Sequence, residues 1–256
     1  MEAISKNRIK YIKQLSQKKH RKQEQKYIAE GAKIIEDLIL AGQSMETIYA
    51  DPDAYQRLSS IASKASIQIV NVDNESIHKA SALSTASNAI AIIPIKQETL
   101  DMTAIKNNLT IALDNIQDPG NLGTIIRIAD WFGIDTILCS KNTVDVFNNK
   151  VIQATMGAIT RIKVHYVDLQ DCLKSATDLH MPIYGTFLKG DNIYTKSLNN
   201  HGIIVMGNEG KGISEEIEAI VNNKITIPSF RQEKGSESLN VAMATSIICS
   251  EFKRKI

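Results

Sequence analysis

The sequence is poor in cysteine, and the few cysteines that it has are far apart. No CxxC pair occurs among Cys139, Cys172 and Cys249, and their number is odd. A disulfide framework needs paired cysteines, and a zinc centre needs closely spaced Cys or His ligands. The histidines of the second half are also dispersed, at His165, His180 and His201. We therefore expect neither disulfides nor a metal site.

Long apolar runs are missing as well. No segment approaches the roughly 18 apolar residues of a membrane span, and the N-terminus lacks the apolar core of a secretory signal. We therefore expect a soluble, cytoplasmic protein without a membrane partner. With 256 residues, 43% of them hydrophobic, the chain can bury a full core and has the length of two domains.

Common nucleotide-binding and hydrolase motifs do not occur. A phosphate-binding loop requires GxxxxGK[ST], but the Gly210-Lys211 pair is followed by another glycine. No GxGxxG follows a strand candidate, so a dinucleotide site has no support. Ser238 has no GxSxG setting, which disfavours a serine hydrolase.

Positive charge is concentrated at the N-terminus. Residues 1–26 hold nine Lys or Arg and two Glu, a net charge of +7, whereas the whole chain has a net charge of +2. Such a concentration is typical of a polyanion partner, although a solvated helix face has the same composition. An apolar stripe is formed by Ile9, Tyr11, Ile12 and Leu15, so we expect a docked amphipathic helix here. Nucleic acid is favoured over membrane because aromatic anchors are few. The expected phosphate contacts are Lys18, Lys19, Arg21 and Lys22.

The chain alternates between strand and helix patterns, which predicts an α/β fold. In residues 1–98 we expect a helix over about 29–40 and a small α/β domain without a catalytic cluster. Residues 96–108 are polar and are expected to be a linker. The second domain, 107–256, has stronger strands, with a turn at 117–123, a helix at 124–132 and a last helix from about Ser238. The strands expected in the two domains are 47–50, 67–72, 89–95, 109–114, 134–139, 163–167, 182–187, 202–206 and 224–227.

Three separated segments of the second domain carry polar residues among glycines and prolines. They are Asn115–Arg127 (NIQDPGNLGTIIR), Ile204–Ser214 (IVMGNEGKGIS) and Ile227–Ala242 (IPSFRQEKGSESLNVA). Each stands where a predicted strand passes into a helix, and ligands of α/β proteins bind at the carboxyl ends of strands. The pattern predicts one site built from several loops.

In order and spacing, these segments resemble the three signature motifs of the SpoU (TrmH-like) RNA ribose 2′-O-methyltransferases of the SPOUT superfamily. The resemblance covers about 107–256. It implies a parallel sheet whose C-terminal part is threaded into a deep trefoil knot, an exception to the rule against knots. It also implies a homodimer. The N-terminal region, with YIAEGAKIIEDLI, more weakly resembles the family's RNA substrate-binding domain.

The resemblance implies the site residues and the cofactor. The active-site positions that match the family are Asn121, Arg127, Glu209, Ser238 and Asn240. The cofactor would be S-adenosylmethionine (SAM), held mainly by backbone groups. The residues expected to line its pocket are Thr186, Phe187, Leu188, Met206, Gly207, Ile227 and Leu239. One departure from the family is the loop 229–237, which is longer than usual and leaves its contacts open.

These residue types suit the chemistry, because Asn, Ser and Glu can hydrogen-bond a ribose hydroxyl and glycines let backbone approach a cofactor. Arg127 is assigned as general base by resemblance, but a guanidinium normally stays protonated, so a phosphate clamp is the alternative. Ribosomal RNA is favoured over tRNA because a whole extra domain is available for docking. Two other functions stay open: a non-catalytic RNA-binding protein on this scaffold, and an unrelated cofactor-binding enzyme.

Overall fold

The computed structural model describes residues 2–83, 85, 87–96, 98–231 and 237–254. It divides into two compact units, and the division differs from the two domains expected from the sequence. Unit 1 contains Met1–Gln97 together with Asp145–Thr160, and unit 2 contains Glu98–Val144 and Arg161–Ile256. A segment of the second half therefore folds with the N-terminal residues. Its pattern of apolar residues could not indicate which unit it packs against.

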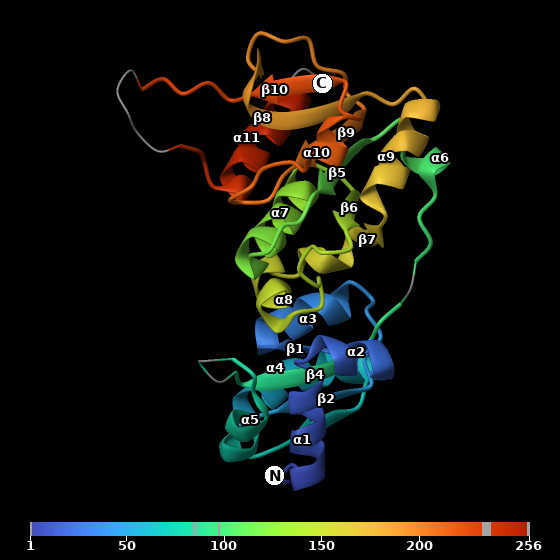
Figure 1. Cartoon of the computed structure of the whole chain (residues 1–256). Helices are drawn as coiled ribbons and strands as arrows, with labels where there is room; N and C mark the ends of the chain where they lie inside the picture. The colour runs from blue at the N-terminus through green and yellow to red at the C-terminus, as the bar shows by residue number, and fades with distance from the viewer. Residues whose placement is uncertain (1, 84, 86, 97, 232–236, 255–256) are drawn as a thin grey trace. The chain divides into compact units, whose positions relative to one another are not determined.

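Unit 1 is built on a four-stranded mixed sheet in the order β1-β4-β2-β3 (Figure 1). β4 pairs antiparallel with β1 and β2, whereas β2 and β3 are parallel. Alternate residues of β1 face opposite sides: Tyr27 packs with α3 and α4, and Ile28 packs with α1 and α5. The strands are β1 (Lys26–Glu30), β2 (Thr47–Ala50), β3 (Ile69–Asn71) and β4 (Ala89–Pro94). The helices are α1 (Lys6–Gln14), α2 (Lys18–Glu24), α3 (Ala32–Leu40), α4 (Pro52–Lys64), α5 (Asn74–Ala80) and α8 (Asn149–Thr155), followed by the 3-10 turn η1 (Ala158–Thr160).

Two expectations for unit 1 were wrong in detail. The helix expected from residue 29 begins at Ala32, because Ala29 and Glu30 pair with β4 and Gly31 has a φ of +103° that ends the strand. The basic N-terminus forms two helices instead of one. The second, α2, ends at Glu24 and is followed by Gln25, whose φ is +51°.

Unit 2 contains a six-stranded sheet in the order β10-β8-β9-β5-β6-β7, and all its strand pairs are parallel. One face packs against α9 and α10, for example through Leu173 and Ile217, and α7 and α11 lie together on the other face (Figure 1). The strands are β5 (Leu109–Leu113), β6 (Thr136–Ser140), β7 (Lys163–Val167), β8 (Ile183–Asn192), β9 (Gly202–Met206) and β10 (Asn223–Thr226). The helices are α6 (Met102–Ile105), α7 (Pro119–Trp131), α9 (Leu169–Asp178), α10 (Glu215–Glu218) and α11 (Val241–Lys253).

The helix starts of unit 2 differ from expectation at the places that matter for the site. The turn expected over 117–123 is in fact the first turn of α7, which begins at Pro119. Asp118 caps this helix by accepting a hydrogen bond from the Asn121 backbone N–H, at 2.8 Å. The last helix begins at Val241 rather than at Ser238, because Asn240 is its N-cap. The expected linker contains α6, and α9 and α10 were not expected at all.

No helix in the described ranges is long and apolar enough to cross a membrane.

Candidate active site

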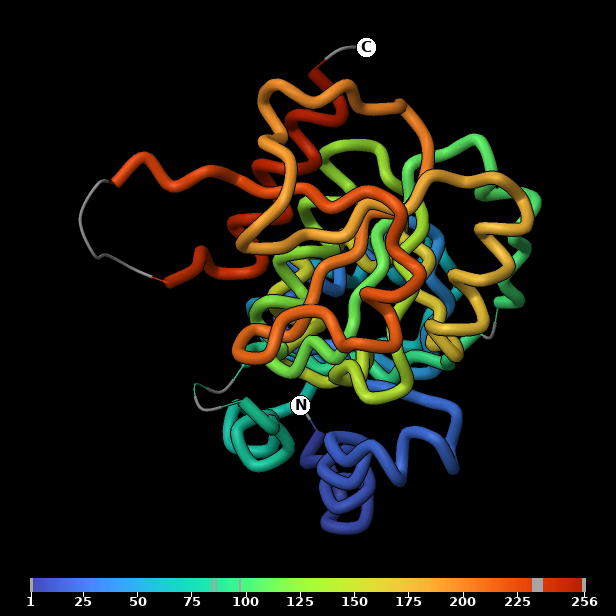
Figure 2. The backbone as a smooth tube through the Cα atoms, turned by 45° about the horizontal axis from the view of Figure 1, so that its top comes forward, coloured from blue at the N-terminus to red at the C-terminus, as the bar shows by residue number. Residues whose placement is uncertain are grey.

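The first and third predicted segments begin just after β5 and β10, and the second runs over the carboxyl end of β9. These strands belong to one parallel sheet, so their carboxyl ends lie at the same edge. In Figure 2 the backbone after β10 extends away from the sheet, whereas the segment after β9 folds back tightly. Side-chain hydrogen bonds connect all three segments.

Glu209, in the segment after β9, receives hydrogen bonds from the start of α7. Its Oε1 accepts from the backbone N–H of Asp118 at 3.2 Å and from Asn121 Nδ2 at 3.0 Å. Its Oε2 accepts from the backbone N–H of Gln117 at 3.3 Å and from Asn208 Nδ2 at 3.4 Å. A carboxylate has about four lone-pair positions, so these contacts occupy its whole accepting capacity. Glu209 therefore ties the start of α7 to the segment after β9.

The hydrogen bonds of Glu209 also determine its charge state. Partial burial by itself would raise the pKa of the carboxyl, but the hydrogen bonds from Asn121 and from the backbone outweigh it. The net result is a lowered pKa. Glu209 is thus an anion with little tendency to take up a proton near neutral pH.

Asn121 connects Glu209 to the third segment. Asn240 Nδ2 donates to Asn121 Oδ1 at 2.9 Å, while Asn240 Oδ1 caps α11 by accepting from the Ala242 and Met243 N–H groups. Each amide thus uses its oxygen and one of its two N–H bonds on the protein. One N–H of Asn121 and one of Asn240 have no partner among the described residues, and they are available to a ligand.

A second set of contacts, which the sequence did not indicate, lies beneath this network. Asp114 follows β5 and is only 2% exposed, and its Oδ2 accepts from both the backbone N–H and the hydroxyl of Ser214, each at 2.7 Å. The next residue, Asn115, has a φ of +59° and accepts from Asn208 Nδ2 at 2.7 Å through its carbonyl. These contacts hold both ends of the segment after β9 against β5. Asp114 directly precedes the first segment, and an Asp at the end of a strand is too common for the sequence to single it out.

Gly207 is the position where a glycine is required. The segment after it is closed by two hydrogen bonds of 2.9 Å between the backbones of Asn208 and Gly212. A Cβ at Gly207 would lie 2.2 Å from the backbone carbon of Gly212 and 2.3 Å from the nitrogen of Ile213. The lack of a side chain therefore permits the tight turn at the end of β9.

The predicted cofactor residues lie on β8 and at the end of β9, in the segments that directly follow β9 and β10, and, for Leu239, shortly before α11. Met206 is buried at the end of β9, and Thr186 Oγ1 donates to the carbonyl of Val205 at 3.0 Å. Leu188 and Leu239 are exposed, and Thr226 Oγ1 donates to the Leu188 carbonyl at 3.3 Å. Exposed apolar side chains beside a glycine turn suit a ligand with an apolar face and groups that hydrogen-bond to backbone. The predicted residue types fit SAM in this respect.

Arg127 and Ser238 stand apart from the network. Arg127 lies on α7 and is exposed, and it has no hydrogen bond or ion pair within the described residues. Ser238 is exposed and likewise makes no side-chain hydrogen bond to the part of the chain described. The loop predicted to be lengthened, 229–237, falls partly outside the described residues, since these resume at Glu237.

The basic cluster of unit 1 is only partly at the surface. Lys18, Lys19 and Lys22 are exposed, in agreement with a role in binding a polyanion. Arg21, however, is only 3% exposed. Its Nη2 is 2.6 Å from Asp145 Oδ2, and its Nη1 donates to the carbonyls of Leu15 and Ser16 at 3.0 and 2.6 Å. These contacts bury Arg21 and tie it to the α1–α2 turn, so the structure does not present it to an RNA phosphate as the sequence led us to expect. The Asp145 partner is 124 residues away, which local sequence could not reveal.

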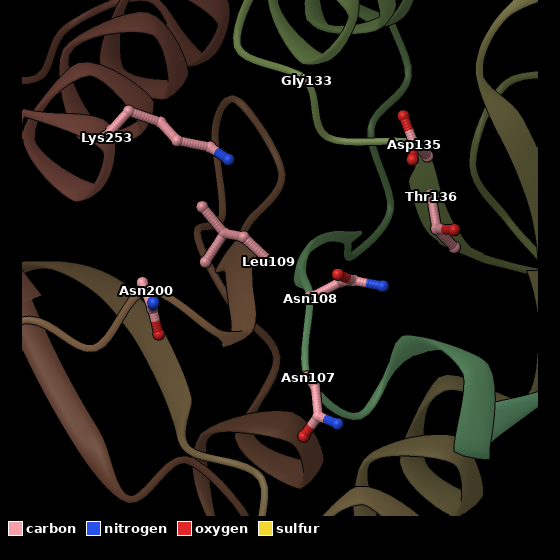
Figure 3. A pocket seen from close by; sticks show the side chains of 8 residues that line it. All are labelled: Asn107, Asn108, Leu109, Gly133, Asp135, Thr136, Asn200 and Lys253. Carbon is pink, nitrogen blue, oxygen red and sulfur yellow. The ribbon is translucent and has the colours of Figure 1, made fainter. Parts of the chain in front are cut away.

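A small polar pocket lies at the opposite edge of the unit 2 sheet, near the amino ends of β5 and β6 (Figure 3). None of the predicted site residues lines it. The lining residues are Asn107, Asn108, Leu109, Gly133, Asp135, Thr136, Asn200 and Lys253. Among the described residues there is also no group of three His, Cys, Asp or Glu placed to hold a metal ion.

Known proteins are similar to this chain in sequence and in structure over nearly its whole length. Among curated proteins, the chain is similar to the Bacillus subtilis 23S rRNA (guanosine(2553)-2′-O)-methyltransferase RlmP, at 26% identity over 97% of this chain and 96% of that protein. Among solved structures it is similar to a TrmH-family protein from Porphyromonas gingivalis, with 33% identity, a TM-score of 0.88 and full coverage of both chains. It is also similar to an AdoMet-bound rRNA methyltransferase from Sinorhizobium meliloti, with 25% identity and a TM-score of 0.85 over 100% of this chain and 97% of that one.

Two family models match the chain. The MRM3-like substrate binding domain matches residues 6–91, within unit 1. The SpoU rRNA Methylase family matches residues 108–250, more than half of the chain and all three site segments. The chain therefore belongs to the SpoU rRNA methylase family.

Proposed function

We propose that this protein transfers a methyl group from SAM to a ribose 2′-hydroxyl of ribosomal RNA. The observation that carries the proposal is the hydrogen-bonded chain Glu209–Asn121–Asn240, which joins the three family motifs in one place. The similar proteins named above include an rRNA 2′-O-methyltransferase and an AdoMet-bound rRNA methyltransferase. Their likeness supports both the substrate class and the cofactor.

The network's part in the reaction is to hold the hydroxyl. A ribose hydroxyl is a weak nucleophile, so it needs orientation and stabilisation of the charge that develops as its proton leaves. The remaining N–H groups of Asn121 and Asn240 are suited to donate to the ribose oxygens. Glu209, with its accepting positions filled and its pKa lowered, is a poor general base. We therefore assign Glu209 to positioning Asn121, and the two asparagines to the ribose.

SAM supplies an electrophilic methyl group when bound. The residues that would hold it are those predicted from the family motifs. Gly207 leaves backbone groups accessible, and the exposed side chains of Leu188 and Leu239 offer apolar surface to the adenosine part. Thr186, Phe187, Met206 and Ile227 complete the proposed pocket. Thr186 Oγ1 donates to the carbonyl of Val205, and Met206 is buried, so β8 is tied to the end of β9.

Arg127 is proposed to clamp the phosphate next to the target ribose. A guanidinium stays protonated in water, so it cannot take the ribose proton, but it can bind a phosphate whose oxygen accepts that proton. Its exposed position, without a partner among the residues that the structure describes, supports a role toward a ligand. Ser238 is proposed to contact the substrate hydroxyl beside Asn240.

We further propose a homodimer in which Arg127 serves the site of the partner subunit. Trp131 supports this proposal: it is 85% exposed on α7, four residues after Arg127, and therefore on the same helix face. A large aromatic side chain exposed to that degree is typical of an interface. Analytical ultracentrifugation tests it, since a monomer at assay concentration would contradict the proposal.

Two further features are proposals from the family resemblance: a cytoplasmic location, and a trefoil knot formed by the C-terminal segment. The packing of α11 on the same face as α7 is compatible with the knot. An experimental structure traced continuously from β8 to α11 tests the knot. An unthreaded chain would refute it.

The proposed function is tested by mapping 2′-O-methylation in RNA from a strain without the gene. The expected result is one ribosomal RNA ribose that loses its methyl group and regains it when the gene is restored. Loss of methylation only in tRNA would assign the enzyme to tRNA instead. An unchanged map, together with no methyl transfer in vitro, would contradict the proposal.

A further inference from the structure

Phe230 is the one exposed phenylalanine of the chain. All five phenylalanines are described, and the other four are buried or partly buried, whereas Phe230 is 84% exposed. It lies four residues after β10, in the third motif segment that leads to Ser238 and Asn240. A single exposed apolar side chain is ordinary on a protein surface, so the significance of Phe230 depends on what it contacts.

The ring is not isolated, because it stacks on Tyr194. The two ring centroids are 6.4 Å apart and the planes are inclined by 29°. Tyr194 in turn is fixed by a tight turn: its N–H donates to Asn192 Oδ1 at 3.0 Å, and the preceding Ile193 is buried and donates its N–H to the carbonyl of Thr226 at 3.0 Å. The aromatic pair therefore stands on a preorganised base that joins the ends of β8 and β10.

Two basic residues lie close to the pair in the sequence. Arg231 follows Phe230 directly, and Lys189 lies on the exposed part of β8. Neither side chain has an ion-pair partner within the ranges described. Lys196, by contrast, is paired with Asp191 at 2.6 Å. Cations that lack a partner in the described ranges, close in sequence to an exposed aromatic stack, suit a polyanion that carries flat rings.

We propose that Phe230 and Tyr194 form a stacking platform for an unpaired base of the RNA substrate, with Arg231 and Lys189 binding the neighbouring phosphates. The inference rests on the proposed function and adds a specificity-determining contact to it. Bases stack on aromatic side chains in single-stranded RNA recognition, and Lys and Arg hold the backbone. The ends of β8 and β10 lie at the same sheet edge as the three motif segments, so a base held there belongs to the strand that enters the site.

The test compares three replacements of Phe230 that separate stacking from apolar contact. Phe230→Trp keeps an aromatic face, Phe230→Leu keeps apolar surface only, and Phe230→Ala removes both. The acceptor is ribosomal RNA from a strain without the gene, and steady-state methyl transfer gives KM and kcat. A short single-stranded RNA carrying 2-aminopurine reports stacking directly through its fluorescence. Leu40→Ala is the matched control, because Leu40 is also an exposed apolar residue, 70% exposed, but lies in unit 1.

We expect Phe230→Ala and Phe230→Leu to raise KM for RNA roughly 5- to 150-fold, the range expected for one lost base stack. Phe230→Trp and Leu40→Ala should stay near wild type, and the dissociation constant for S-adenosylhomocysteine should not change. Wild-type behaviour of Phe230→Leu would overturn the inference, as would an altered cofactor affinity or oligomeric state in Phe230→Ala. If the wild type methylates no RNA, the proposed function fails, while oligonucleotide binding still tests the platform.

Discussion

The side-chain amides of Asn121 and Asn240 are hydrogen-bonded at 2.9 Å although 119 residues separate them in the sequence. Asn121 is in the first turn of α7 and Asn240 is the N-cap of α11, so the bond joins the starts of two helices. Because Glu209 holds Asn121 from the other side, the orientation of both amides is fixed before any ligand binds. Such preorganisation is what a site for a weak nucleophile requires.

We predict that adding a side chain at Gly207 displaces the segment after β9. In Gly207→Ala the new methyl group would overlap the backbone at Gly212, so the segment after β9 must shift. We expect S-adenosylhomocysteine binding, measured by calorimetry, to weaken more than 10-fold, an order-of-magnitude estimate for a displaced binding loop. Gly210→Ala is the control, because the nearest atom to its Cβ would be 3.8 Å away. Equal effects of the two changes would refute the explanation.

The exposed lysines of α2 predict a salt-dependent effect. Replacing Lys18, Lys19 and Lys22 together by Ala should weaken RNA binding and reduce the slope of log affinity against log salt, because fewer counterions are released. The unfolding midpoint and the cofactor affinity should not change. If RNA affinity and salt slope remain those of the wild type, the lysines are only a solvated surface.

Arg21, in the same helix, should behave in the opposite way. Arg21→Ala leaves Asp145 without its buried partner and should reduce the free energy of unfolding by about 3 to 5 kcal/mol. Urea unfolding measures this difference. A loss of RNA affinity at unchanged stability would mean that Arg21 reaches the RNA after all.

Glu209 predicts how stability depends on pH. Its folded-state pKa is lowered, so its contribution to stability is present above the ordinary pKa of 4.5 and is lost as the pH falls through the lower folded value. Glu209→Gln should remove this part of the acid dependence, so its stability should fall less steeply than that of the wild type below pH 4.5. Urea unfolding at a series of acid pH values is the measurement. Parallel curves for the two proteins would contradict the lowered pKa.

The proposed sharing of Arg127 between subunits predicts complementation. Arg127→Ala and Asn240→Ala should each abolish nearly all methyl transfer as separate proteins. After subunit exchange, mixed dimers should regain activity, because one of their two sites then has both residues. No recovery despite verified exchange would show that each subunit builds its site alone, or that either change disables both sites. Arg127→Lys separates a phosphate clamp from a simple charge, since an ammonium cannot bind bidentately.

Much of the site was predictable because its residues lie in three distinctive segments. Asn121, Glu209 and Asn240 were predicted, and the structure brings them into one network. The start of α7 was also readable in principle, because Asp118 followed by proline is a helix-start signal. The role of Asp114 was not predicted, because its hydrogen-bond partner is the hydroxyl of Ser214, 100 residues away.

The limits of prediction in unit 1 have the same cause. Lys18, Lys19 and Arg21 look alike in a basic run, and only the position of Asp145 decides that the arginine is buried. The sequence predicts a helix over 149–157 and the structure has one over Asn149–Thr155, but the pattern could not show that Ile152 joins the core around β1. Long-range partners, unlike local patterns, are set by the fold as a whole.

The central claim is that the Glu209–Asn121–Asn240 network holds a ribose for 2′-O-methylation. Its most direct test follows the methyl group in the wild type and in Asn121→Asp. That change puts a carboxylate against Glu209, and like charges at hydrogen-bond distance should open the network. Asn107→Ala, at the opposite sheet edge, is the control. Labelled SAM is incubated with ribosomal RNA from a strain without the gene, and the RNA is digested to nucleosides. We predict label in a single 2′-O-methylnucleoside for the wild type and the control, and at least a 100-fold lower rate for Asn121→Asp, the order of magnitude for a lost transition-state donor. Label on a base, or full activity in Asn121→Asp, would contradict the account.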